Sequence, residues 1–216
     1  MPGLFVTFEG GEGSGKSTQV ARLAARLVAL GHDPLVTREP GGTPLAEGIR
    51  ALLLDPERRP TAHAEAFLME AARAQLVQTV IRPALAAGRV VVCDRYADST
   101  LAYQGAGRGL DAAMLRQWNI AATGGLQPDL TLLFDIAHEA GLERRNSAPG
   151  DTNRLDREPS AFHARVRARF LELAAADPAR FHVIDATASV EALEAEVWEA
   201  VQPRLPAPIQ PGDRRA

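Results

Sequence analysis

One run of eight residues near the start of the chain, Gly10-Gly11-Glu12-Gly13-Ser14-Gly15-Lys16-Ser17, has the residue types and spacing needed to hold a triphosphate. It fits the P-loop pattern G-x-x-x-x-G-K-[ST] without a mismatch. Its glycines free backbone N–H groups to point at phosphate oxygens, and a following helix N-terminus adds positive potential. Lys16 is expected to reach the β- and γ-phosphates, and the Ser17 hydroxyl to ligate magnesium. The alternative is a glycine-rich turn in which Lys-Ser occurs by chance.

Charged residues also stand where apolar runs end. Arg38 follows the run 35–37, Asp94 and Arg95 follow 90–93, and Asp135 ends 130–135. Ligands of parallel sheets bind beyond the carboxyl ends of the strands, so these side chains are expected to share a crevice with the P-loop. The Arg95 guanidinium is suited to a two-pronged grip on a phosphate.

Two carboxylates are candidates for a magnesium site. Asp94 could bind magnesium directly or through a water, and the alternative is that it caps a helix. Glu9, just before the P-loop, could orient a magnesium-bound water.

The elements that must position these residues alternate along the chain. Five apolar runs are typical of buried strands: 4–8, 35–37, 90–93, 130–135 and 182–185. Helices are expected after the P-loop as far as Gly31, then over 44–53, 62–81, 99–104 and 140–145, and after Asp111, Ser160 and Ser189. Arg82-Pro83 is expected to end or kink the helix over 62–81. This order predicts an α/β fold of the P-loop NTPase kind, with a parallel sheet covered on both faces.

A polar segment from Asn146 to Arg157 is long for a loop in a compact domain. Arg144, Arg145, Arg154 and Arg157 lie in it or at its edge. Arginines of a mobile lid, here about 144–157, can close over a triphosphate and neutralise charge that develops in phosphoryl transfer. The alternative is a solvated, arginine-rich loop.

The composition favours one globular domain over residues 1–202, followed by a proline-rich, disordered tail over 203–216. The net charge of −3 argues against a nucleic acid polymer as partner. No apolar run is long enough to span a membrane, and the chain enters its first strand without room for a signal peptide. The single cysteine, Cys93, lies in a strand-like run, which favours a core position and a reducing cytoplasm.

Several longer motifs resemble bacterial thymidylate kinases over nearly the whole chain except the tail. They are Phe8-Glu9-Gly10 with the P-loop, Thr37-Arg38-Glu39-Pro40-Gly41-Gly42-Thr43, Asp94-Arg95-Tyr96, Ser99-Thr100-Leu101-Ala102-Tyr103-Gln104-Gly105, Gln127-Pro128-Asp129-Leu130-Thr131, Asp156-Arg157 and Ile184-Asp185-Ala186-Thr187. The resemblance implies transfer of the ATP γ-phosphoryl to dTMP with magnesium, a five-stranded parallel sheet and a homodimer. A Ras-type GTPase is disfavoured because the chain has neither an N-K-x-D nor a D-x-x-G element.

The same resemblance implies roles for individual residues. Arg38 and Arg95 would hold the dTMP phosphate, Arg73 would bond the thymine, Gln104 would lie by the base, and Tyr103 would crowd the sugar 2′ position. Ser99 and Glu12 would complete the substrate site. Thr18 would extend the ATP-binding loop, and Ala186 and Thr187 would lie near the adenine. Glu12 inside the loop resembles the subtype whose catalytic arginine comes from the lid, as Arg157 or Arg154.

One position departs from the family pattern. Four residues before the arginine that reads thymine, the family usually has a phenylalanine stacked on the base, and this chain has Met69. Met69 is expected either to contact the base with a side chain more flexible than phenylalanine, or to belong to the core. Two other functions remain open: a kinase for another small molecule, such as an adenylate or uridylate kinase, and a nucleotide-dependent switch without turnover.

Overall fold

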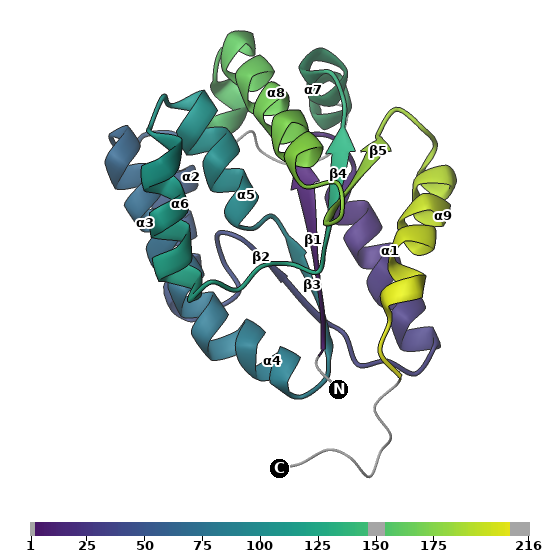
Figure 1. Ribbon diagram of the computed structural model, residues 1–216. Coiled ribbons are helices and arrows are strands. Elements are labelled where there is room, and N and C mark those ends of the chain that lie inside the picture. The colour runs from purple at the N-terminus through teal and green to yellow at the C-terminus, as the bar shows by residue number, and fades with distance from the viewer. Residues whose placement is uncertain (1–2, 147–153, 208–216) are drawn as a thin grey trace.

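The computed structural model describes residues 3–146 and 154–207. Its centre is a parallel sheet of five strands in the order β2-β3-β1-β4-β5 (Figure 1). The strands are β1 (Leu4–Gly10), β2 (Leu35–Arg38), β3 (Val90–Asp94), β4 (Leu130–Asp135) and β5 (Phe181–Asp185). All five expected strands are therefore confirmed, and their carboxyl ends lie along one edge of the sheet.

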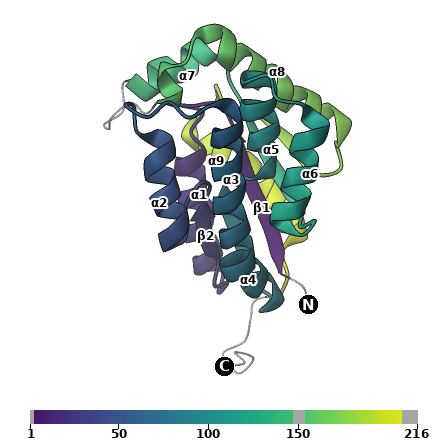
Figure 2. The same cartoon turned by 90° about the vertical axis from the view of Figure 1, so that its left-hand side faces the viewer.

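Helices cover both faces of the sheet. Their bounds are α1 (Lys16–Ala29), α2 (Pro44–Leu54), α3 (Ala62–Leu76), α4 (Arg82–Ala86), α5 (Ala97–Thr100), α6 (Ala112–Thr123), α7 (His138–Asn146), α8 (Ser160–Ala176) and α9 (Val190–Val201). In Figure 1, α1 and α9 lie to the right of the sheet, and α3 to α6 lie to its left. Figure 2 shows α2 and α3 side by side, where Ala46, Ile49, Leu53 and Ala72 form their shared core.

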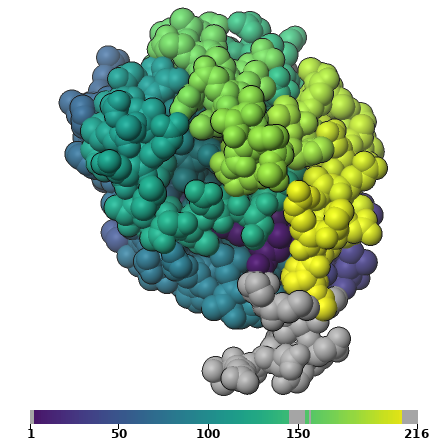
Figure 3. All heavy atoms as spheres, viewed as in Figure 1, coloured from purple at the N-terminus to yellow at the C-terminus, as the bar shows by residue number. Residues whose placement is uncertain are grey.

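The alternation of residues along β1 decides which layer each contacts. Leu4, Val6 and Phe8 belong to the core cluster that also contains residues of α1 and α9. Phe5 belongs to the cluster on the other face, with Leu76 and Ile81. Because β1 is central and covered on both faces, only the beginning of this purple strand is visible in the space-filling view (Figure 3).

Side-chain caps begin several of the helices. Thr43, Asp111 and Ser189 each accept a hydrogen bond from a backbone N–H in the first turn of α2, α6 and α9. Each bond satisfies a donor that has no partner inside its helix. Gly31, with a φ of 83°, follows the end of α1 as a C-terminal glycine.

The helix predicted over 62–81 does not end at Arg82-Pro83. It passes from α3 through a π-helical turn, Val77–Ile81, into α4, which extends to Ala86. A proline lacks a backbone N–H and clashes with the preceding turn, and the wider π turn before Pro83 accommodates both effects. A second π-helical segment, Leu101–Gly107, continues α5 beyond the range 99–104 expected for this helix and ends at Gly107.

The proline-rich segment expected from residue 203 begins inside the folded domain. Gln202–Arg204 form a 3-10 turn, and Leu205 packs against the core cluster of α1 and α9. Residues 208–216 lie outside the described part of the chain, as do 147–153 of the predicted lid. The later part of that lid, Leu155–Arg157, forms a 3-10 turn before α8.

Candidate active site

The P-loop joins β1 to α1 as predicted and is closed by its own lysine. Lys16 Nζ donates to the carbonyl oxygens of Gly10 at 3.1 Å and Gly11 at 2.6 Å, and to Ser14 Oγ at 3.1 Å. Burial, followed by the charge of Arg95, lowers the pKa of Lys16 to about 8, against the opposing pull of Glu12. A bound polyphosphate would favour the charged amine again, because an opposite charge stabilises the protonated form.

Gly13 shows why this loop needs glycine at a particular position. Its φ of 70° is left-handed, and a Cβ there would overlap the carbonyl oxygen of Gly141 in α7. A Cβ on Gly141 would in turn overlap the carbonyl oxygen of Glu12. The P-loop and the helix that leads into the predicted lid therefore touch through their backbones.

A cavity of about 830 Å³ opens at the carboxyl ends of the strands. Its walls include the predicted residues Glu12, Gly13, Ser14, Gly15, Lys16, Ser17, Thr18, Arg38, Asp94 and Arg95. Glu39, Arg50 and the run 188–190 also line it and were not predicted. The predicted adenine residues do not: Ala186 is fully buried, and the carbonyl oxygens of Ala186 and Thr187 accept hydrogen bonds from Arg144.

Ser17 and Asp94 meet at this cavity, as a magnesium site requires. Ser17 Oγ donates to Asp94 Oδ2 at 2.7 Å. Among the described residues, no group of three or more His, Cys, Asp or Glu side chains could hold a metal by itself. A hydroxyl beside one carboxylate nevertheless fits Mg²⁺, which is bound through one or two protein ligands together with substrate phosphates.

Glu9, which was predicted to orient a magnesium-bound water, is not among the residues that line the large cavity. Its side chain is buried beneath the site, where it accepts hydrogen bonds from the N–H groups of Tyr96 at 2.8 Å and Ser99 at 3.3 Å, and from Ser99 Oγ at 2.6 Å. Burial, and then the charge of Asp98, raises the pKa of Glu9 to about 7. Glu9 therefore orders the turn after β3 and does not face the cavity.

Arg95 lines both the large cavity and a smaller one. Its φ of 70° is unusual for a residue with a side chain, and its guanidinium donates to Gly10 O at 2.9 Å and Glu12 Oε1 at 2.6 Å. Burial would raise the pKa of Glu12, but the charges of Arg95 and Lys16 lower it on balance. The Arg95 guanidinium also lies 5.0 Å from the centre of the Tyr103 ring.

The smaller cavity, of about 100 Å³, contains most of the predicted substrate residues. Glu12, Met69, Arg95, Ser99, Tyr103, Gln104 and Arg154 all line it. The Tyr103 hydroxyl donates to Glu12 Oε1 at 3.3 Å, and Arg154 donates to Leu53 O at 3.0 Å and Glu65 Oε2 at 2.6 Å. Arg157, the other predicted lid arginine, is exposed and lines neither described cavity.

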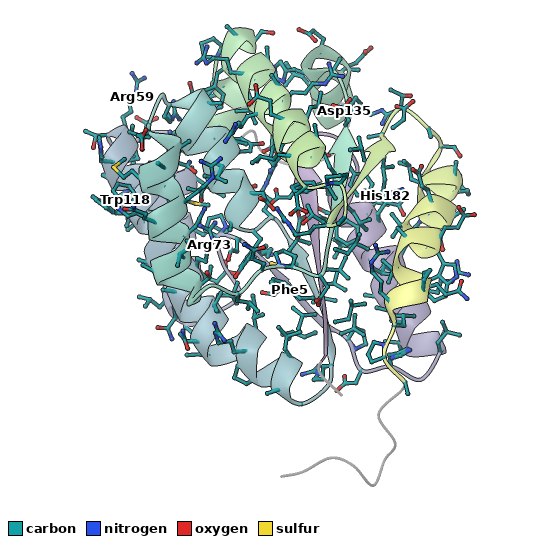
Figure 4. The ribbon with its side chains drawn as sticks, in the orientation of Figure 1. Phe5, Arg59, Arg73, Trp118, Asp135 and His182 are labelled. Atoms are coloured by element: carbon teal, nitrogen blue, oxygen red, sulfur yellow. The ribbon has the colours of Figure 1, made fainter. Side chains whose placement is uncertain are left out.

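Arg73 does not line the cavity where thymine was expected. Its side chain is fully buried on the left of the sheet in Figure 4 and donates to Glu39 Oε2, Glu70 Oε1, Thr100 Oγ1, Asn119 Oδ1 and Tyr96 O. The charges of Glu39 and Glu70 raise the pKa of Arg73 although burial alone would lower it. In this conformation Arg73 joins α3, α5 and α6, and its donors are engaged by the protein.

Three charged residues of the two cavities were missed: Glu39, Arg50 and Glu65. Glu39 stands in the motif Thr37–Thr43, which carries the family resemblance but predicts no role for this residue. A signal for Glu65 existed, since residues 65, 69 and 73 share one helical face, on which an acidic residue is unusual. Arg50 had no comparable signal, because it reaches the site only through the packing of α2 on α3.

The strand order and the P-loop at the carboxyl end of β1 define the protein's class, a protein with a P-loop nucleoside triphosphate-binding fold. A sequence model of thymidylate kinase matches residues 8–197. The chain is 54% identical to a thymidylate kinase of Deinococcus radiodurans over 202 residues, covering 94% of this chain and 98% of the relative. A Thermomicrobium roseum thymidylate kinase is 56% identical over 198 residues, covering 91% and 93%.

Solved structures give the same result. The crystal structure of thymidylate kinase from Ehrlichia chaffeensis has a TM-score of 0.76 and 32% identity, and the match covers 94% of this chain and 99% of that one. The chain belongs to the thymidylate kinase family.

Proposed function

We propose that this protein transfers the γ-phosphoryl group of ATP to dTMP, forming dTDP in the synthesis of dTTP. The main support is that its two cavities share four charged lining residues, Glu12, Glu39, Arg50 and Arg95. The large cavity contains the P-loop and suits ATP. The small cavity, of about 100 Å³, has Met69 and Tyr103 in its wall; it is smaller than the usual site for a whole nucleotide, so it would take only the flat base of the monophosphate.

The transfer needs charge and position more than proton chemistry. The attacking oxygen of a nucleoside monophosphate is already anionic, so no general base is required. Arg38 and Arg95 would hold the acceptor phosphate, and Lys16 would hold the β- and γ-phosphates of ATP. Arg154, which lies in the wall of the small cavity, would neutralise charge that develops on the transferred group. Ser17 and Asp94 would hold Mg²⁺, which supplies positive charge to the phosphates when it is bound.

A coupled assay of ADP release tests this function. The protein is given ATP, magnesium and, in turn, dTMP, dUMP, dCMP, AMP and UMP. We expect the highest kcat/KM with dTMP, and much lower values with AMP and UMP. A preference for AMP or UMP would identify a different nucleoside monophosphate kinase. Binding of ATP without release of ADP for any acceptor would indicate a switch or binding protein.

We also propose that the protein is a cytoplasmic homodimer. The side chains of Phe67 on α3 and Ile120 on α6 are 54% and 60% exposed, and the Phe67 ring lies 4.5 Å from that of Trp118. These helices pack against each other, so their outer faces offer one apolar surface to a second copy. No described helix is both long enough and apolar enough to span a bilayer. Sedimentation equilibrium of Phe67→Glu against the unmodified chain tests the dimer, because a charge there should raise the dissociation constant.

A further inference from the structure

A buried carboxylate that was not predicted, that of Glu65, lies in the wall of the small cavity. Only 2% of the residue is exposed, and four groups donate to its two oxygens. Oε1 accepts from Gln104 Nε2 at 2.7 Å and from Arg108 Nε at 3.2 Å. Oε2 accepts from Arg108 Nη2 at 3.2 Å and from Arg154 Nη2 at 2.6 Å.

This environment keeps Glu65 ionised. Burial would raise the pKa of its carboxyl, but the hydrogen bonds from Gln104 and Arg108, with the charges of Arg108 and Arg154, lower it below the usual value. An ionised carboxylate can accept hydrogen bonds and cannot donate one. The Gln104 side chain must therefore turn its NH₂ group toward Glu65, and the amide has a single possible orientation.

That orientation leaves one polar atom of Gln104 for a ligand. Gln104 is 3% exposed and lines the small cavity, and its Oε1 has no hydrogen-bond partner among the described residues. A buried acceptor without a partner is costly, and a donor on a bound ligand would satisfy it. The ring N3 of thymine or uracil carries such a hydrogen, whereas the ring N3 of cytosine is itself an acceptor and would face Oε1 with a lone pair.

We propose that Glu65 is a positioning residue for base selection. By holding the Gln104 amide in one orientation, its carboxylate makes the site accept a pyrimidine with a protonated N3 and reject cytosine. This inference rests on the proposed function, because it takes the small cavity as the site of the base of the monophosphate. The Glu65 carboxylate also accepts a hydrogen bond from Arg154 of the predicted lid. It therefore positions both Gln104, which would contact the base, and Arg154, which would neutralise charge during the transfer.

The decisive variant is Glu65→Gln, measured as the ratio of kcat/KM for dTMP to kcat/KM for dCMP. A glutamine at 65 can donate as well as accept, so the Gln104 amide is free to turn and present its NH₂ group to the base. We expect the ratio to fall by at least about tenfold, with a higher KM for dTMP and a lower KM for dCMP. An unchanged ratio in a folded, active variant would overturn the proposal.

A matched control separates orientation from general damage. Asp98 is also a buried carboxylate held by an arginine, at 2.6 Å from Arg180 Nη1, and it lines neither described cavity. Asp98→Asn should lower the melting temperature and leave the dTMP to dCMP ratio unchanged. If Asp98→Asn lowers the dTMP to dCMP ratio as much as Glu65→Gln does, general destabilisation of the fold explains both results and the proposal fails.

Two further variants complete the test. Arg154→Met removes the contact between Arg154 and Glu65 but leaves Glu65 beside Gln104. It should therefore lower kcat without changing the dTMP to dCMP ratio. A large fall in that ratio would assign base selection to Arg154 and refute the role of Glu65. If Glu65→Gln does not fold, Glu65→Asp keeps the charge but withdraws the carboxylate from Gln104, and an unchanged ratio there would refute the proposal. If the unmodified enzyme shows no preference for dTMP over dCMP, the proposed function itself is wrong.

Discussion

The backbone contact between the P-loop and α7 can be tested with four single glycine-to-alanine substitutions. Gly13 combines a left-handed φ of 70° with a Cβ position that overlaps Gly141 O. Gly15 has the left-handed backbone alone, with a φ of 87° and nothing within 4 Å of its Cβ position. Gly141 has the overlap alone, and Gly11 has neither feature. The four variants therefore separate backbone strain from the close approach.

The expected losses of unfolding free energy are the sum of a backbone contribution and a close-contact contribution. A left-handed residue with a side chain costs about 1–2 kcal/mol, and an atom forced into a packed contact costs about 1–3 kcal/mol. Gly13→Ala should therefore lose about 2–5 kcal/mol of unfolding free energy. For a domain of this size about 1 kcal/mol shifts the melting temperature by about 2–4 °C, so the loss is about 4–20 °C. Gly15→Ala should lose about 2–8 °C, while Gly11→Ala should stay within about 2 °C. Gly141 lies inside α7, where alanine is favoured over glycine by about 1 kcal/mol, so Gly141→Ala should lose about 0–8 °C.

Thermal unfolding without nucleotide is the right assay, because each of these glycines except Gly141 belongs to the triphosphate-binding loop. ATP affinity is then measured separately for the variants that fold. If Gly13→Ala melts at the same temperature as Gly15→Ala, the approach of α7 to the loop costs nothing and the two segments are not in tight contact. If Gly141→Ala is more stable than the unmodified chain by the full helical preference of alanine, about 1 kcal/mol, the same conclusion follows from the other side of the contact.

Four other predictions concern the site itself. Lys16→Ala should lower kcat by at least about 100-fold with an unchanged circular dichroism spectrum, and retained turnover would contradict the triphosphate role of the loop. Arg154→Ala should lower kcat more than Arg157→Ala, because only Arg154 lines a described cavity; the reverse order would mean that Arg157 enters the site during turnover. Met69→Phe should bind dTMP as tightly as the unmodified chain or up to about tenfold tighter, whereas a lower melting temperature with unchanged affinity would make Met69 a core residue. Glu9→Gln should alter how the free energy of unfolding depends on pH. The pKa of Glu9 is about 7 in the folded chain and 4.5 in the unfolded chain. The stabilisation that the protonated Glu9 carboxyl provides is therefore complete below pH 4.5 and is lost as the pH rises through 7. The unmodified chain should therefore lose about 1–3 kcal/mol relative to Glu9→Gln between pH 5 and pH 8, measured by urea unfolding, and parallel pH profiles would contradict the buried, protonated carboxyl.

The amino-acid sequence by itself determined the sheet, the P-loop and the edge at which the site lies. Apolar runs, caps such as Thr43 and Asp111, and the P-loop glycines act over a few residues, so their consequences can be predicted locally. The charged residues Arg38, Asp94 and Arg95 followed from the same reasoning. In a parallel sheet the residues after successive strands gather at one edge whatever the details of packing.

Only the tertiary structure decided which polar side chains face the ligand and which hold the protein together. Arg73 and Glu9 stand in the expected segments, yet both are buried by partners distant in sequence: Arg73 by Glu39 and Asn119, and Glu9 by Ser99. Glu65 contacts Gln104 and Arg154 for the same reason. A buried charge must find its hydrogen bonds wherever the fold brings partners near it, and those partners come from helices whose relative placement is not encoded in any local pattern.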